Sequence, residues 1–302
     1  MSITFKIFYG TREKRVNVTD KITEVDGVKI IPDGDVKRSI IFGIDPAPGV
    51  LKSVYILDKQ IETEYPHYSL IYIINSVIYR QDKLPENVVC LSVFDRLEQV
   101  QDSLSLLHGE FKDEYPEQVM SLLYIKGHEK VLEIGANIGR NSLIISRLLK
   151  DSSNLLSIES DPQSFEKLNE NKIINKLDFN IENCAISKRP LIQKDWNTEI
   201  NDTVPDGWTR VKTLTYQQIV DKWKIQFDTL VIDCEGAFYY MLMDAPEIIK
   251  GVNLVIMEND YQTFSHKEYI ENVFKANGFY LDYSLSGGWG PCSSSFYEVW
   301  KK

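Results

Sequence analysis

The stretch VLEIGANIGRNS, from Val131 to Ser142, decides the fold of this chain. Four mostly apolar residues lead into a loop of small residues, and an expected helix follows the loop. A glycine-rich turn between a first strand and a first helix brings a ligand close to the backbone and to the helix N-terminus. The residues of this loop therefore indicate which cofactor it can hold.

Strand-like and helix-like segments alternate from Lys130 to the end of the chain. This alternation predicts an α/β fold with a mainly parallel sheet covered on both faces, and ligands of such sheets bind beyond the carboxyl ends of the strands. The expected strands are KVLEIG (130–135), NLLSIE (154–159), FNIENCAI (179–186), FDTLVID (227–233), VNLVIME (252–258), GFYLDYSL (278–285) and SFYEVW (295–300). Helices are expected at Ile138, at Asp161 with Pro162 in the first turn, after Gly236, and at Thr215 and Ser265, where Gln218 and Glu268 predict capping boxes.

The residues before this region have a different pattern. Residues 1–90 contain short β-branched and aromatic runs between turn signals, among them KRSIIFGI (37–44), and predict a small β-rich accessory domain. Residues 91–127 show apolar residues three and four apart, with Pro116 where a helix could start, and predict a helical connector that packs against the following sheet. Residues 128–302 form the third expected part.

Charge and cysteine spacing exclude several classes of protein. A net charge of -10 repels phosphate backbones, and no basic run offsets it, so no nucleic-acid partner is expected. The N-terminus lacks the features of a secretory signal, and the longest apolar stretch, SLIYIINSVIY (69–79), is too short and too polar for membrane insertion. The four cysteines are far apart and form no CxxC pair, which indicates reduced thiols in a cytoplasmic protein. A homo-oligomer stays open.

The loop itself narrows the choice of cofactor. The dinucleotide fingerprint GxGxxG would need glycine where this chain has Asn137, and no Lys-Ser or Lys-Thr follows Gly139 as a P-loop requires. Glu159 lies twenty residues after Gly139, at an expected strand end where a carboxylate can accept both hydroxyls of a ribose. Together with Glu133 before the loop, this pattern favours a nucleoside that carries an amino acid over one that carries phosphates. The alternative is a turn that only packs strand on helix.

At these residues the chain resembles the FkbM family of S-adenosylmethionine-dependent methyltransferases, from Val131 to about Lys302. Four segments resemble ordered motifs of that family: VLEIGANIGRNSL (131–143), SIESDPQSFEKLNENKIIN (157–175), IENCAIS (181–187) and FDTLVIDCEGAFYYMLMDAPEII (227–249). Thr215 and Tyr216 depart from the Leu-Asp pair that the family usually has.

The resemblance implies a Rossmann-like methyltransferase sheet whose last strand is antiparallel. It also implies O-methylation, with a sugar hydroxyl of a glycan or glycoconjugate as the acceptor. The cofactor-binding residues that follow from it are Glu133, Gly135, Asn137, Gly139, Glu159, Ser160, Asn183, Cys184, Ala185 and Asp233.

Methyl transfer is an in-line displacement by a hydroxyl, so the protein must align the two groups and remove a proton. The catalytic candidates lie after the fourth and fifth expected strands of the sheet and are Asp233, Glu235, Glu258 and His266. For each carboxylate alone, capping a helix or binding loop amides is at least as good an interpretation, and for His266 the alternative is a solvent-exposed first helical turn. A sharper hypothesis groups Asp233, Glu258 and Asn259 as oxygen ligands for Mg²⁺ or Mn²⁺, similar to catechol O-methyltransferase-like enzymes, where the metal acidifies the acceptor hydroxyl.

Two loops are candidates for binding the acceptor. Residues 188–210 contain Trp208, and residues 284–300 contain Trp289, and aromatic rings beside polar groups suit a sugar. The alternative is a long hairpin whose tryptophans cover the edge of the core. Two other functions stay open: a catalytically silent binding or scaffold protein on a methyltransferase fold, and a methyltransferase for a non-sugar acceptor.

Overall fold

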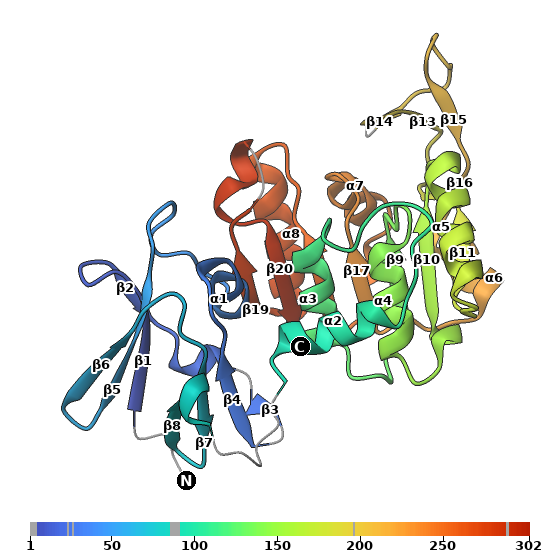
Figure 1. Cartoon of the computed structure of the whole chain (residues 1–302). Coiled ribbons are helices and arrows are strands. Elements are labelled where there is room, and N and C mark those ends of the chain that lie inside the picture. Colours follow the sequence, from blue (N-terminus) through green and yellow to red (C-terminus); the bar gives the residue numbers. More distant parts are fainter. Residues whose placement is uncertain (1–4, 23, 26, 85–90, 196, 288–289) are drawn as a thin grey trace. The chain divides into compact units, whose positions relative to one another are not determined.

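The computed structural model of the chain describes residues 5–22, 24–25, 27–84, 91–195, 197–287 and 290–302 (Figure 1). It divides into two compact units, Met1–Arg96 and Leu97–Lys302. Within the described residues, no helix combines the length and the apolar character that crossing a bilayer requires.

The first unit contains two four-stranded antiparallel sheets, with the strand orders β2-β1-β5-β6 and β3-β4-β7-β8. Alternating apolar residues build them: in β1, Phe5, Ile7 and Tyr9 are all buried. The elements are β1 (Phe5–Gly10), β2 (Arg15–Asn17), β3 (Glu24–Val25), β4 (Val28–Ile31), α1 (Asp35–Phe42), β5 (Ser53–Asp58), β6 (Ile61–Tyr65), β7 (Ile71–Ile74) and β8 (Val77–Arg80).

The run KRSIIFGI is not a strand, because most of it belongs to helix α1. Arg38, Ile41 and Phe42 are buried and lie three and four residues apart, which places them on one helical face. The guanidinium of Arg38 donates to the carbonyl oxygens of Pro32, Pro66 and Ser69, three contacts that anchor the helix in this orientation. These tertiary contacts outweigh the β propensity of the run.

The second unit contains a seven-stranded sheet with the order β11-β10-β9-β17-β18-β20-β19. The pairs from β11 through β18 are parallel, and the last strand, β20, is antiparallel to both of its neighbours. All seven expected strands occur in this sheet, and the predicted fold class is confirmed: a Rossmann-like methyltransferase sheet preceded by β sheets. The strands are β9 (Val131–Ile134), β10 (Leu155–Glu159), β11 (Asn180–Asn183), β17 (Thr229–Ile232), β18 (Leu254–Glu258), β19 (Tyr280–Leu285) and β20 (Tyr297–Lys301).

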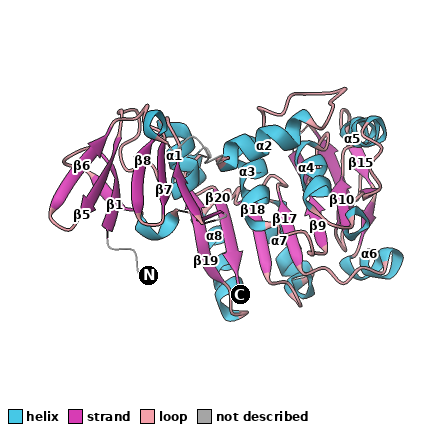
Figure 2. Cartoon of the chain, turned by 60° about the horizontal axis from the view of Figure 1, so that its bottom comes forward, coloured by secondary structure: helices cyan, strands magenta, loops and turns pink. Residues whose placement is uncertain are grey.

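Helices cover both faces of this sheet (Figure 2). A large apolar core lies between the sheet and helices α6, α7 and α8, and Leu132 and Ile134 of β9 belong to it. Because side chains alternate along a strand, Glu133 points to the other face, where α4 packs against α3. The helices are α2 (Val93–Asp102), α3 (Tyr115–Tyr124), α4 (Arg140–Leu148), α5 (Pro162–Ile174), α6 (Tyr216–Trp223), α7 (Ala237–Asp244) and α8 (Phe264–Ala276).

The helix starts test the capping predictions. Asp161 caps α5 by accepting from the Ser164 amide at 2.7 Å, and the capping box of Thr215 at α6 is present. The capping box at Ser265 is wrong, since α8 begins after Thr263 without a side-chain cap, and the Ser265 hydroxyl pairs with the hydroxyl of Thr263 instead.

Short strands between β11 and α6 form two further sheets. Three antiparallel strands have the order β14-β13-β15, and a parallel pair joins β12 to β16. Most of the expected acceptor loop 188–210 is therefore a hairpin with a third strand. The strands are β12 (Ala185–Ile186), β13 (Leu191–Lys194), β14 (Asn197–Ile200), β15 (Thr209–Val211) and β16 (Thr213–Leu214).

Candidate functional site

The loop between β9 and α4 requires glycine at its two ends. Gly135 has a φ of +86°, and a Cβ atom there would lie 1.5 Å from the carbonyl oxygen of Asp233. Gly139 has a φ of +90°, and its Cβ would lie 2.4 Å from the Cδ1 atom of Leu168 on α5. The loop is therefore packed against the end of β17 on one side and against α5 on the other.

Asn137 stands where the dinucleotide motif has glycine, and it takes the backbone conformation that a glycine would take. Its φ is +48°, in the left-handed region that asparagine tolerates better than most residues. Its amide nitrogen donates to Glu159 Oε2 at 2.7 Å, and its side-chain Nδ2 donates to Glu114 Oε1 at 3.0 Å. Asn137 thus ties the loop to β10 and to the start of α3.

The other loop amides are also bound inside the chain. The amides of Gly135 and Ala136 both donate to the Ile158 carbonyl at 3.0 Å, and the Gly139 amide donates to the Ala136 carbonyl at 2.8 Å. A phosphate at a helix N-terminus is held by backbone amides that point at it. Because four amides of this loop already have partners, the loop does not form a phosphate cradle.

Glu159 ends β10 and is buried, with 7% of its surface exposed. Its second carboxylate oxygen, Oε1, accepts from the Asp161 amide at 2.7 Å. Burial raises the pKa of Glu159 to about 7, and the amides of Asp161 and Asn137 limit this rise. Each carboxylate oxygen has a further lone pair, so the group can still accept hydroxyl donors.

Three other predicted cofactor residues gather at the end of β10. Asn183 Nδ2 and the Cys184 amide donate to the Glu159 carbonyl oxygen at 2.9 and 3.1 Å. Ser160 follows Glu159, and its hydroxyl donates to a side chain of β13 at 3.0 Å. Cys184 is buried, and this burial raises the pKa of its thiol to about 12. Ala185 begins β12 and pairs with β16.

Glu133 lies beneath the loop rather than at its surface. Its side chain is buried, and Oε2 accepts from the hydroxyls of Ser142 on α4 and Ser157 on β10, both at 2.5 Å. Burial raises the pKa of Glu133 to about 7, and the two hydroxyl bonds partly counteract the rise. The residue joins β9, α4 and β10 from inside the second unit.

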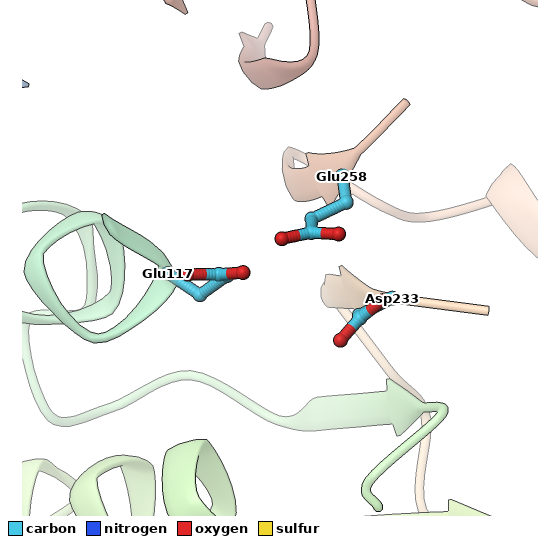
Figure 3. A group of neighbouring side chains, drawn as sticks. All are labelled: Glu117, Asp233 and Glu258. Atoms are coloured by element: carbon cyan, nitrogen blue, oxygen red, sulfur yellow. The ribbon is translucent and has the colours of Figure 1, made fainter. Parts of the chain in front are cut away.

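Asp233 and Glu258 meet a third acidic residue, Glu117, and these three residues are called the carboxylate cluster below. Asp233 follows β17, Glu258 ends β18 and Glu117 belongs to α3, and their side chains point toward one another (Figure 3). Burial, followed by the nearby Glu117 carboxyl group, raises the pKa of Asp233 well above its ordinary value. Burial and the neighbouring Glu117 and Asp233 raise the pKa of Glu258 to about 12.

The sequence predicts Asn259 beside Asp233 and Glu258, whereas the structure places Glu117 there instead. Asn259 is adjacent to Glu258, so the pleat directs its side chain elsewhere, and its Nδ2 donates to the buried Glu298 at 3.1 Å. Glu117 lies in the segment that was expected to act only by packing. The sequence signal that could have revealed Glu117 is its helical spacing. It lies three and four residues before Met120 and Ser121, so it shares the buried face of α3.

A second group of residues, which the sequence did not reveal, binds the loop between β9 and α4 on its outer side. Asn171 of α5 is fully buried; its Oδ1 accepts from the Leu107 amide, and its Nδ2 donates to the Ile138 carbonyl at 2.9 Å. Arg140 forms ion pairs with Glu114 at 2.7 Å and with Asp113 at 3.2 Å. These contacts hold the segment before α3 against the loop.

The turns after β17 and β18 lie close together. Gly236 has a φ of +80°, and its Cβ would lie 2.7 Å from the Asp260 carbonyl oxygen. Burial, followed by the adjacent Asp260, raises the pKa of Glu235 to about 7. Glu235 is therefore the predicted catalytic carboxylate whose pKa is nearest to neutral.

His266 lies in the first turn of α8 and stacks on an aromatic ring of α7. The ring centroids of His266 and Tyr239 are 3.8 Å apart at an interplanar angle of 12°, and the ring centroids of His266 and Tyr240 are 5.7 Å apart in a T-shaped contact. Partial burial lowers the pKa of His266. The imidazole is accordingly neutral near pH 7 and can accept a proton.

Of the two tryptophans that the sequence predicts to bind the acceptor, the structure describes one. Trp208 is half-buried beside β15, and its amide donates to the Pro205 carbonyl. Trp289 lies outside the described residues, so its role stays a prediction.

No family model and no curated protein sequence matches this chain. Among solved structures, the O-methyltransferase from Bacillus cereus in complex with SAH is 12% identical, with a TM-score of 0.42, over 72% of this chain and 94% of that one. The ribosomal protein L11 methylase from Lactobacillus delbrueckii subsp. bulgaricus is 14% identical, with a TM-score of 0.42, over 66% of this chain and 83% of that one. The fold assignment rests on the strand order and strand directions of the sheet itself.

Proposed function

We propose that this protein is an S-adenosylmethionine-dependent O-methyltransferase of the FkbM type. The observation that carries the proposal is the junction between loop 135–139 and Glu159, described above. The carboxylate at this strand end can accept ribose hydroxyls, while the occupied loop amides disfavour the pyrophosphate of a dinucleotide. A nucleoside that carries an amino acid fits both features.

The chain's own residues account for the binding and positioning steps. S-adenosylmethionine supplies a methyl group on a positively charged sulfur when it is bound. Glu159 would hold the ribose, and Asn183 and Cys184, which are hydrogen-bonded to the backbone of Glu159, would border the base. Gly135 and Asn137 would let the cofactor approach the loop backbone.

Four residues were candidates for removing the acceptor proton, and their pKa values separate them. Burial and the neighbouring carboxyl groups raise the pKa of Glu258 to about 12 and raise the pKa of Asp233 well above its ordinary value, so both are weak candidates for the base. Glu235 has a pKa of about 7, which suits a general base near pH 7, and His266, whose pKa is lowered by burial, is neutral there and can accept a proton. We therefore propose Glu235 or His266 as the base.

We further propose a sugar hydroxyl of a glycan or glycoconjugate as the acceptor. Support comes from the aromatic group at the starts of α7 and α8, which follow β17 and β18. Tyr239 stacks on His266, Tyr240 contacts both rings edge-on, and Phe264 is 62% exposed. Rings with polar edges suit the apolar faces and the hydroxyls of a sugar. Trp208 remains a proposed second contact.

Cofactor binding is tested by calorimetry with S-adenosylhomocysteine on the full chain. We expect wild type to bind, and Glu159→Ala to weaken binding by about tenfold to a hundredfold, because hydrogen bonds to a charged group are lost. Glu166→Ala, which removes an exposed carboxylate from α5, is the matched control and should bind like wild type. Circular dichroism confirms that each variant is folded. A folded wild-type protein without binding would contradict the proposal.

The acceptor is tested separately, with a labelled methyl donor and panels of sugars, phenols and peptides. Label on a sugar oxygen is the expected result. Label only on phenols or peptides would retain the methyltransferase and overturn the sugar assignment.

A further inference from the structure

The carboxylate cluster has the geometry of an oxygen ligand set. Each of its three residues offers one oxygen, and these oxygens lie within 4.8 Å of one another. An octahedral Mg²⁺ at a distance of about 2.1 Å from each ligand places its oxygens roughly 3 to 4 Å apart. Small adjustments of the three side chains would therefore close them around one ion. Figure 3 shows the three carboxyl groups directed toward a common point.

No lysine, arginine or histidine forms an ion pair with the cluster within the described part of the chain. Burial raises the pKa of Glu117, and the charge of Arg140 partly counteracts this rise. Arg140, on the neighbouring α4, is already paired with Glu114 and Asp113. Glu117 is buried, and the other two residues of the cluster are half-buried. Carboxylates crowded into such a site repel one another when they are charged, and a cation that binds between them removes this repulsion.

An independent observation comes from Asn141, which lines the same cavity as the cluster. Asn141 is 8% exposed, and its Oδ1 atom is buried without a hydrogen-bond partner. Glu117 is 5% exposed, and its Oε2 atom is likewise buried without a partner. An unpartnered amide oxygen and an unpartnered carboxylate oxygen beside the same space are the donors that hard divalent cations prefer.

The size of the cavity limits what can occupy it. Its volume is about 10 Å³, which is about the space that one water molecule needs. A single ion fits this space.

We propose that Glu117, Asp233, Glu258 and Asn141 form a binding site for one divalent cation of the Mg²⁺ or Mn²⁺ class. The ion would join α3 to the ends of β17 and β18, directly below Gly135 of the loop. This inference concerns cation binding by the chain itself, so it does not depend on methyl transfer or on the acceptor.

The test is a titration of the chelator-treated full chain with Mn²⁺, in which electron paramagnetic resonance measures the free ion. We expect one Mn²⁺ per chain, displaced by Mg²⁺, and a melting temperature that rises when Mn²⁺ is added. Glu117→Gln and, independently, Glu258→Gln should weaken Mn²⁺ binding at least about tenfold, because each removes a carboxyl group that the bound ion would hold in its charged form. Glu110→Gln, an exposed position before α3, is the control of equal charge change and should bind like wild type.

Two results would overturn the proposal: no Mn²⁺ binding by wild type, or binding that neither cluster variant weakens. The metal-free melting temperatures of the two variants show whether they are folded. Failure of this test leaves the calorimetric test of Glu159 untouched.

Discussion

Two regions at the same edge of the sheet use acidic residues in opposite ways. At the end of β10, Glu159 is buried, but its carboxylate accepts hydrogen bonds from two backbone amides, those of Asn137 and Asp161. At the ends of β17 and β18, Asp233 and Glu258 face Glu117, another acid. The pKa of Glu159 rises only to about 7, whereas the pKa of Glu258 rises to about 12. The partners of a buried carboxylate, rather than burial alone, decide its protonation.

The largest effect is expected at Gly135, where the two regions touch. Gly135→Ala would place a Cβ atom 1.5 Å from the Asp233 carbonyl oxygen, so the loop and the end of β17 would have to separate. We expect a loss of more than about 4 kcal/mol in the free energy of unfolding, or no folding, measured by urea denaturation.

Gly251→Ala is the matched control for this substitution. Gly251 has a φ of +84°, and nothing lies within 4 Å of a Cβ atom there, so only backbone strain of about 1 to 2 kcal/mol is expected. Equal losses in the two variants would show that the close contact at Gly135 has no energetic role.

A smaller effect is expected from Glu133, which shares features of both regions. Its pKa in the folded state is about 7 against an ordinary 4.5, so the folded state holds the proton more tightly than the unfolded state. Glu133 therefore adds its full contribution to the free energy of unfolding below about pH 4.5, and this contribution is lost as the pH rises to about 7. The contribution totals about 3 kcal/mol, since one pKa unit corresponds to about 1.4 kcal/mol.

Glu133→Gln should remove this part of the pH dependence. Urea denaturation of chelator-treated protein between about pH 4.5 and pH 8 measures it, and Glu166→Gln should keep the wild-type slope. A Glu133→Gln profile parallel to that of wild type would show that Glu133 is charged in the folded protein throughout this range.

The smallest effect is expected at Asn137, where backbone conformation and a side-chain bond can be separated. Asn137→Gly keeps the left-handed conformation and loses only the bond to Glu114, whereas Asn137→Ala loses both. We expect a loss of about 1 kcal/mol for glycine and about 1 kcal/mol more for alanine, measured by thermal melting. If alanine were tolerated better than glycine, the left-handed backbone at this position would not matter.

Local patterns were enough for the sheet and for the loop. Apolar runs separated by turn and cap signals located all seven strands. The signal is clearest in β9, β10, β17 and β18, where burial on both faces leaves a nearly continuous apolar pattern. Gly135, Asn137 and Glu159 could be selected from the sequence because backbone conformation and strand ends are encoded by neighbouring residues. Ser265 shows the limit of such patterns, since its capping signal was present while α8 began after Thr263.

The sequence by itself thus determined the order along the chain of the strands in the large sheet, the edge of that sheet at which Glu159, Asp233 and Glu258 lie, and the loop that lacks the dinucleotide and P-loop motifs. Only the tertiary structure decided that Glu117 joins Asp233 and Glu258, that Asn259 turns toward Glu298, and that the run after Lys37 is a helix. The physical reason is the range of the interactions. Backbone conformations and strand patterns depend on adjacent residues, whereas the carboxylate cluster forms only when α3 packs near two strand ends more than a hundred residues further along the chain.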